Sequence, residues 1–191
     1  MKERILRKEE FVTTKWAGGE TTQLAIYPEG SVFANRDFLW RISSATFSNT
    51  ESTFSDFTGY QRYILPLEGD LSIHHMGLYE RNLKPYEVEY FDGSWTTSSK
   101  NSPDCRDYNF IVKSGSLARL QVLLEGEEYF VKKDSITIFF SVDDFDIELI
   151  GHGEKREVEG FSLYVIEGNE EEQVRIFNAQ SPVIMNEYIM G

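Results

Sequence analysis

The sequence predicts an all-β protein with closed or stacked sheets, and three observations carry that prediction. Apolar and polar residues alternate in short runs that are rich in β-branched and aromatic side chains, as expected of half-buried strands. Gly, Asn, Asp and Pro bound most of these runs, and these residues favour turns. No segment has a sustained apolar stripe of helical period. Many short strands must close or stack to remove free edges, which favours a barrel or sandwich with little helix.

The first clear strand covers residues 38–47. Its Trp40 and Ile42 share one face and its Arg41 and Ser43 share the other, because successive strand side chains point to opposite sides. Further strands are predicted at residues 86–91, 108–113, 117–124, 128–132, 135–141, 145–150, 161–167 and 173–177.

Residues 63–73 predict a β-hairpin that turns at Glu68-Gly69-Asp70. Pro66 interrupts its first strand. Proline has no backbone N–H to donate to a neighbouring strand, so this position is expected at a sheet edge or a bulge.

A polar, turn-rich stretch at residues 93–106 separates two β-rich halves of similar size. Such a stretch is typical of a connection or an open loop. We therefore expect two barrel domains, at residues 1–100 and 101–191, with an approximate boundary and termini that can interleave.

The charge and composition exclude several classes of partner. The net charge of −13 opposes nucleic acids and anionic membrane surfaces, because binding to phosphates needs Lys and Arg. No apolar stretch approaches the roughly 20 residues of a membrane span, and the charged N-terminus does not resemble a secretory signal. A single cysteine, Cys105, fits the reducing cytosol. Association through sheet edges makes a homodimer one expectation for the oligomeric state.

Residues 15–24 form the most unusual stretch. Gly18 and Gly19 allow a tight turn or a close backbone approach to a ligand, and Thr21 and Gln23 then share one face of the following strand. Together with Trp16 they would suit the wall of a pocket for a small polar molecule. The alternative is an ordinary β-turn with Trp16 packed beneath it.

Two arginines and an asparagine are further candidates. Arg41, beside Ser43 on one strand face, would need a carboxylate partner inside a barrel. That partner could be a ligand or one of the 32 acidic side chains. Arg62, directly before the 63–73 hairpin, is a second basic group. Asn109 can form hydrogen bonds with the backbone or with a ligand.

Four motifs together resemble the HutD/Ves family. They are residues 16–22 (WAGGETT), 40–43 (WRIS), 54–62 (FS, then Gly59 and Arg62) and 107–110 (DYNF). The resemblance covers the whole chain and implies a bacterial double cupin with a pocket in its N-terminal barrel. It implies either histidine utilisation, with a ligand such as urocanate or a formylated glutamate, or a role in cold or stress responses.

The chain departs from the family at the glycine turn. The family pattern reads Trp-x-Asn-Gly-Gly-Gly-Thr-Thr-Arg, whereas here Ala17 replaces the asparagine, Glu20 the third glycine and Gln23 the arginine. These changes remove a donor and a positive charge and add a negative charge.

Metal and nucleophilic chemistry have little support. Cupin metals are held by several histidines and a carboxylate, but His74 and His75 are consecutive and must face opposite sides of a strand, and His152 lies in a predicted turn. We therefore expect no metal and no cofactor. Asp104 and Asp107 would disfavour a Cys105 thiolate, an effect that Arg106 partly offsets. No catalytic constellation is recognised.

Three functions remain open. The first is a metal-free binding or regulatory protein for a small carboxylate. The second is a metal-independent isomerase or hydrolase of a small polar metabolite, with Arg41 and Arg62 as electrostatic clamps. The third is a protein-interaction module that uses the acidic surface and the aromatic segment 86–95. The ligand-binding prediction comprises Trp16, Gly18, Gly19, Thr21, Gln23, Arg41, Ser43, Arg62 and Asn109.

Overall fold

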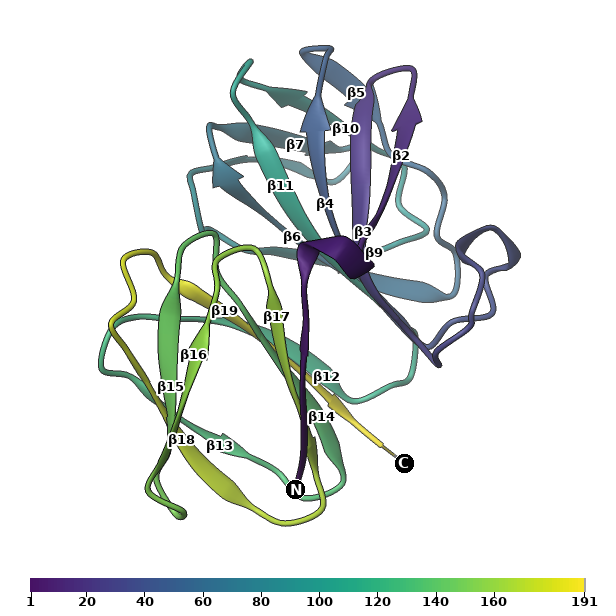
Figure 1. Cartoon of the computed structure of the whole chain (residues 1–191). Coiled ribbons are helices and arrows are strands. Elements are labelled where there is room, and N and C mark those ends of the chain that lie inside the picture. The colour runs from purple at the N-terminus through teal and green to yellow at the C-terminus, as the bar shows by residue number, and fades with distance from the viewer. Residues whose placement is uncertain (191) are drawn as a thin grey trace. The chain divides into compact units, whose positions relative to one another are not determined.

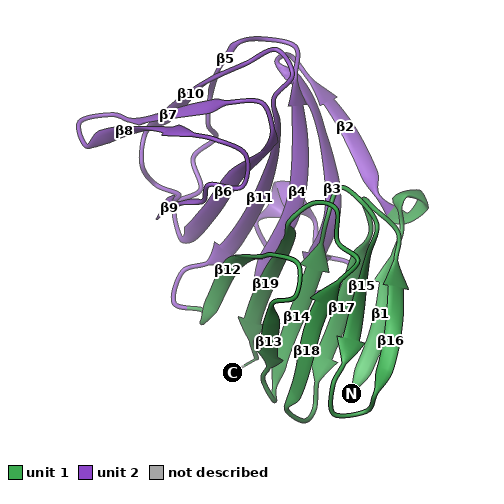
Figure 2. Cartoon of the chain, turned by 90° about the vertical axis from the view of Figure 1, so that its left-hand side faces the viewer, with its two compact units in different colours: residues 1–10, 116–191 green, residues 11–115 purple. Residues whose placement is uncertain are grey.

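The computed structural model describes residues 1–190. The chain divides into two compact units, drawn in two colours in Figure 2. Residues 11–115 form the central unit, and residues 1–10 join the chain from Ser116 onward in the terminal unit.

The central unit contains two antiparallel sheets. The six-stranded sheet has the order β2 (Val12–Trp16), β3 (Gly19–Tyr27), β4 (Trp40–Phe47), β11 (Arg106–Lys113), β6 (Tyr60–Glu68) and β9 (Glu89–Asp92). The four-stranded sheet has the order β5 (Glu51–Thr53), β10 (Thr97–Asn101), β7 (Leu71–His75) and β8 (Tyr79–Leu83). A short 3-10 helix, η2 (Phe33–Asn35), lies between β3 and β4.

The terminal unit also contains two antiparallel sheets. The five-stranded sheet has the order β1 (Lys2–Leu6), β17 (Leu163–Gly168), β14 (Ser135–Phe140), β19 (Val183–Ile189) and β12 (Ala118–Leu123). The four-stranded sheet has the order β13 (Glu128–Val131), β18 (Glu172–Phe177), β15 (Phe145–Leu149) and β16 (Glu154–Val158). Strand β1 runs beside β17 (Figure 1) and leads into the 3-10 helix η1 (Lys8–Glu10), so the N-terminus belongs to this unit.

The predicted all-β class is confirmed, and each predicted strand overlaps an observed one. Pro66 lies opposite Asp107, where the register between β6 and β11 shifts, so the expected bulge is present. The strands that the alternation did not predict include several exposed or polar ones. In β2, for example, every residue is exposed, and such a strand carries no apolar alternation. β2 lies at one edge of the six-stranded sheet. A homodimer formed through a sheet edge stays a prediction.

The expected connection at residues 93–106 is wrong. Residues 97–101 form β10, which pairs with β5 and β7. Its inward side chains are polar but buried, because each finds a hydrogen-bond partner: Ser99 meets the Ser52 hydroxyl at 3.0 Å, and Asn101 donates to the Asn49 carbonyl at 3.1 Å. The compact units divide after Gly115 instead.

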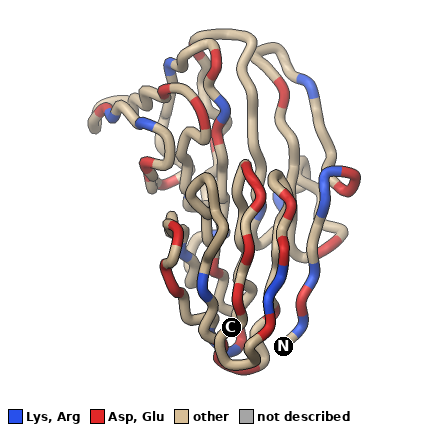
Figure 3. The backbone as a smooth tube through the Cα atoms, turned by 60° about the vertical axis from the view of Figure 1, so that its left-hand side comes forward, with Lys and Arg blue, Asp and Glu red and all other residues tan. Residues whose placement is uncertain are grey.

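Charge is spread along both units. Acidic side chains occur on strands and loops alike and outnumber basic ones, 32 to 19 (Figure 3). None of the helices in residues 1–190 is long or apolar enough to cross a membrane.

Candidate ligand-binding site

The strand register gathers polar side chains on one face of the six-stranded sheet. Cross-strand pairing between β3, β4, β11 and β6 aligns three neighbouring rows: Arg41, Ile111 and Arg62; then Gln23, Ser43 and Asn109; then Thr21, Ala45 and Asp107. Neighbouring side chains in such rows lie within contact distance.

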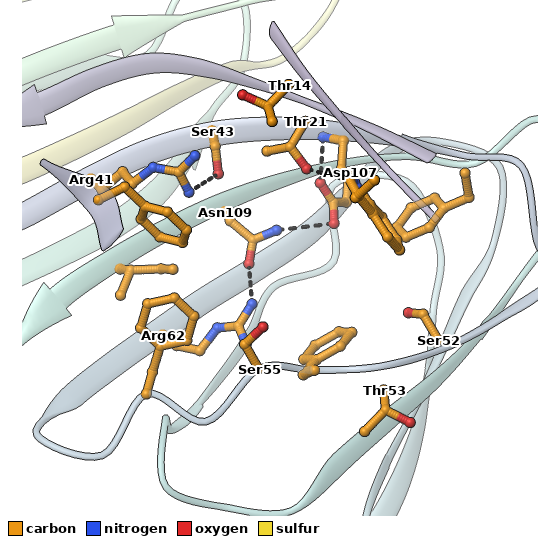
Figure 4. A pocket seen from close by; sticks show the side chains of 17 residues that line it. Thr14, Thr21, Arg41, Ser43, Ser52, Thr53, Ser55, Arg62, Asp107 and Asn109 are labelled. Carbon is orange, nitrogen blue, oxygen red and sulfur yellow. Dashed lines mark hydrogen bonds between the residues drawn. The ribbon is translucent and has the colours of Figure 1, made fainter. Parts of the chain in front are cut away.

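Apart from Gln23, the residues of these rows form the floor of a cavity of about 410 Å³ (Figure 4). Trp16 of β2 and Phe33 of η2 contribute to its walls, and the segment around β5 adds hydroxyl and aromatic groups. The full lining comprises Thr14, Trp16, Thr21, Phe33, Arg41, Ser43, Ala45, Phe47, Ser52, Thr53, Phe54, Ser55, Phe57, Arg62, Asp107, Asn109 and Ile111. The mixture of aromatic walls with a few polar groups is typical of a small-molecule site.

Arg62 is buried and incompletely satisfied. One terminal nitrogen donates to Asn109 Oδ1 at 2.8 Å, while its Nε has no hydrogen-bond partner. The guanidinium carbon lies 4.6 Å from the ring centre of Phe54 and 5.3 Å from that of Phe57. Burial lowers the pKa of Arg62 to about 10, so it remains charged at neutral pH.

Arg41 is held by two neutral groups. Its Nε donates to Gln23 Oε1 at 2.8 Å, and one terminal nitrogen donates to Ser43 Oγ at 3.1 Å. The guanidinium stacks on Phe33, 4.0 Å from the ring centre. Burial lowers its pKa to about 10, and the nearby positive charge of Arg36 acts in the same direction.

Neither arginine has a carboxylate partner. Within residues 1–190, Arg41 and Arg62 take part in no ion pair, although both are only 7% exposed. Most buried charges in proteins are paired. The cavity therefore holds two guanidinium groups that make no direct ion pair, near the carboxyl group of Asp107.

Asp107 is the acidic group of the cavity. Its Oδ1 accepts the Ala45 backbone N–H at 2.8 Å, and its Oδ2 accepts the Asn109 amide at 2.9 Å (Figure 4). Burial raises its pKa to about 7, against the opposing effects of these donors and of Arg62. The sequence signal for Asp107 was its place two residues before Asn109 on the same strand face.

The structure brings most of the predicted site residues together. Six of the nine line the cavity: Trp16, Thr21, Arg41, Ser43, Arg62 and Asn109. Gln23 lies behind them as the partner of Arg41. Phe33 and Phe57 line the cavity but were not among the predicted residues, because the segments between strands that carry them have no periodic pattern that would single them out.

Gly18 and Gly19 shape the turn between β2 and β3 and do not line the cavity. A Cβ at Gly19 would lie 2.0 Å from the Thr46 carbonyl oxygen, and one at Gly18 would lie 2.1 Å from the Trp16 ring. Both distances are far inside van der Waals contact, so the close approach of backbone and indole requires glycine here. The Trp16 indole N–H donates to Thr21 Oγ1 at 3.1 Å.

Comparison with known proteins identifies the family. The family model HutD matches residues 8–184 of the chain. The chain belongs to the HutD family. An uncharacterized 21.2 kDa protein in the hutC 3′ region of Pseudomonas putida is 29% identical over 175 residues, which is 88% of each chain.

Solved structures agree with this assignment at the level of the fold. A conserved protein of unknown function from Pseudomonas aeruginosa PAO1 superposes with a TM-score of 0.85 at 24% identity, and HutD from Pseudomonas fluorescens SBW25, in a formate condition, with 0.79 at 23%. Both alignments cover 100% of each chain. A cupin 2 conserved barrel protein from Leptotrichia buccalis aligns with a TM-score of 0.58 at 12% identity, over 98% of this chain and 96% of its own, consistent with the predicted cupin fold.

The departures from the HutD pattern lie outside the cavity lining. Ala17 is exposed in the turn, and Glu20 forms an ion pair with Lys15 at 3.2 Å. Gln23 has a direct role, because its amide oxygen accepts from Arg41. An arginine at this position would instead add a further positive charge beside Arg41.

The donor set of this HutD-family chain does not fit the metals that many cupins hold. His74 is exposed and His75 is buried, as expected for opposite faces of β7. The His75 ring bonds to Thr97 Oγ1 at 2.9 Å and faces Glu89 at 3.6 Å. Within the described residues, no three His, Cys, Asp or Glu side chains gather around one position. The sheet rows at the cavity carry arginine, serine and asparagine instead.

Two other predicted features turn inward. The Cys105 thiol is buried, and burial together with Asp107 raises its pKa to about 12, so it is a poor nucleophile at neutral pH. In the aromatic segment 86–95, Phe91 is buried and Trp95 packs on His75. Of these rings only Tyr90 is largely exposed, which leaves the interaction-module hypothesis little aromatic surface.

Proposed function

We propose that this HutD-family chain binds a small carboxylate in the cavity of the central unit, without a metal, in a regulatory role. The observation that carries the proposal is the pair of buried arginines without a carboxylate partner. A guanidinium fork matches the geometry of a carboxylate, and such bonds are stronger than those between neutral groups. A ligand carboxylate would supply the missing negative charge.

The walls favour a ligand with a planar face. Phe33, Phe54 and Phe57 line the cavity beside the two guanidinium groups. Urocanate and a formylated glutamate, the class implied by the family, combine a carboxylate with a flat group. The Pseudomonas putida relative is described by its place in the hutC 3′ region, which supports a link to histidine utilisation.

The test is a binding screen with matched variants. Formate, urocanate and N-formylglutamate are titrated by thermal shift and calorimetry, with formamide as a neutral counterpart. At least one carboxylate should stabilise the protein through linkage, and formamide should not. Arg41→Met or Arg62→Met should weaken the affinity by about 100-fold, because a charged hydrogen bond contributes roughly 2–3 kcal/mol.

Arg175→Met is the control, because Arg175 lies on the surface of the terminal unit and pairs with Glu128. It should leave the affinity unchanged. An equal stabilisation of the native protein and of both cavity variants would refute the assigned site.

The alternative is a metal-independent enzyme, and Asp107 is the observation that favours it. A carboxyl group whose pKa lies near 7 and which borders the cavity has the properties of a general acid or base. Chromatography of each ligand after incubation with the purified protein separates the two functions: an enzyme converts its ligand, and a binding protein returns it unchanged.

A further inference from the structure

The Asp107 carboxyl group is connected to Arg62 by one amide. Asn109 donates from Nδ2 to Asp107 Oδ2 at 2.9 Å and accepts from Arg62 at its own Oδ1, at 2.8 Å. An anion that contacts Arg62 from the cavity therefore lies close to the Asp107 carboxyl group. Asp107 is 4% exposed, so little water separates the two negative groups.

The charged and titratable groups around Asp107 come from two strands and one turn. β4 contributes Arg41, β6 contributes Arg62, and the turn directly before β11 contributes the neutral thiol of Cys105. β3 contributes Thr21, which does not titrate. The two direct partners of the carboxyl oxygens are the uncharged Ala45 N–H and Asn109 amide.

We propose that the cavity takes up a proton at Asp107 when a carboxylate binds at Arg62, so that the ligand is held as an anion beside a neutral carboxylic acid. This inference rests on the proposed function. It also narrows the ligand class, because the part of the ligand nearest Asp107 would then be a hydrogen-bond acceptor and not an N–H donor.

Like charges in a shared buried site disfavour simultaneous ionisation. In the free protein, burial already raises the pKa of Asp107 to about 7. A further rise on ligand binding would therefore protonate the carboxyl group at neutral pH. Below pH 6 Asp107 is protonated before the ligand arrives, and binding takes up no proton. Above pH 7 binding requires uptake, and affinity should fall by up to about tenfold per pH unit.

An N–H donor at this position would produce the opposite trend. An ionised Asp107 would accept the donor, binding would release a proton, and affinity would rise with pH. Replacement of the carboxylate by a neutral amide would then weaken binding.

The experiment uses formate and urocanate as probes in calorimetry at about pH 6, 7 and 8. Each pH is measured in two buffers of different ionisation enthalpy, because proton exchange makes the heat depend on the buffer. We expect uptake of roughly half a proton at pH 7 and nearly one at pH 8. Asp107→Asn should remove the uptake, and its affinity should not change between pH 6 and pH 8. Asp104→Asn, an exposed neighbour outside the cavity lining, should behave as the native protein does.

The buffer comparison on the native protein decides the inference even if Asp107→Asn does not fold. Carboxylate binding that is independent of buffer and of pH overturns the inference and leaves the proposed function intact. Proton release on binding overturns it in favour of the donor arrangement. Failure of both probes to bind, or binding that Arg62→Met does not change, overturns the proposed function and this inference together.

Discussion

The central and terminal units each contain two antiparallel sheets, but the interiors of the two units differ. The terminal unit has one large apolar cluster that includes Phe139, Phe145 and Tyr164, all nearly inaccessible. The central unit has smaller clusters and a polar cavity of about 410 Å³. A similar architecture can therefore serve as a packed core or as a binding site, depending on the inward residues.

The buried arginines at the cavity also differ from a buried charge of the terminal unit. In the terminal unit Glu187 is 2% exposed, and it is paired with Lys132 at 3.0 Å and with Arg119 at 3.2 Å. In the central unit Arg41 and Arg62 bond only to neutral groups. Removing one partner of a buried ion pair leaves an unpaired charge and destabilises the fold, whereas an arginine without an acidic partner can pair with an anionic ligand.

The largest expected effect tests the packed core. Phe139→Ala should lower the free energy of unfolding by about 3–5 kcal/mol, because it opens a void in a dense interior. Phe33→Ala is the counterpart at the cavity wall, where the ring is 36% exposed, and should cost about 1 kcal/mol or less. Urea denaturation measures both. Equal losses would show that the two interiors are packed alike.

A smaller effect, of opposite sign in the two units, tests the charges. Without ligand, Arg62→Met should raise the free energy of unfolding by roughly 1 kcal/mol, since an apolar side chain of similar length replaces an unpaired buried cation. Glu187→Met should lower it by roughly 1–3 kcal/mol, because the Tyr129 hydroxyl also loses its acceptor. A loss in both variants would mean that Arg62 stabilises the free protein.

The smallest effect concerns the cavity wall. Gly18→Ala should displace the Trp16 ring, which is 41% exposed, because the new Cβ would overlap it. The indole N–H resonance of Trp16 should shift as its bond to Thr21 breaks, while the free energy of unfolding falls by about 1 kcal/mol or less. Ala17→Ser, in the exposed part of the turn, should leave the resonance in place.

Much of the candidate site followed from strand periodicity. The alternation predicted that Arg41 and Ser43 share a face, and a hydrogen bond joins them. It likewise predicted a common face for Thr21 and Gln23, although only Thr21 reaches the cavity. Alternation fixes which side of a strand a residue occupies, but not how far its side chain extends once a neighbour such as Arg41 captures it.

The polar strand β10 and the cavity residue Phe33 could not be predicted in this way. In β10, hydrogen bonds to Ser52 and Asn49 make buried polar residues acceptable, and both partners lie about fifty residues away in the chain. Phe33 reaches the cavity through a loop whose position depends on its packing against Phe38 and Phe57.

The sequence by itself determined the all-β class, most of the strands and the face on which each candidate side chain lies, because these depend on local periodicity. Only the tertiary structure decided that the central unit would keep a cavity and that Arg41 and Arg62 would lack acidic partners. Both facts depend on pairing between β4, β6 and β11, which are distant in the chain. The predicted binding protein is now defined by two unpaired guanidinium groups and by the buried carboxyl group of Asp107 beside them.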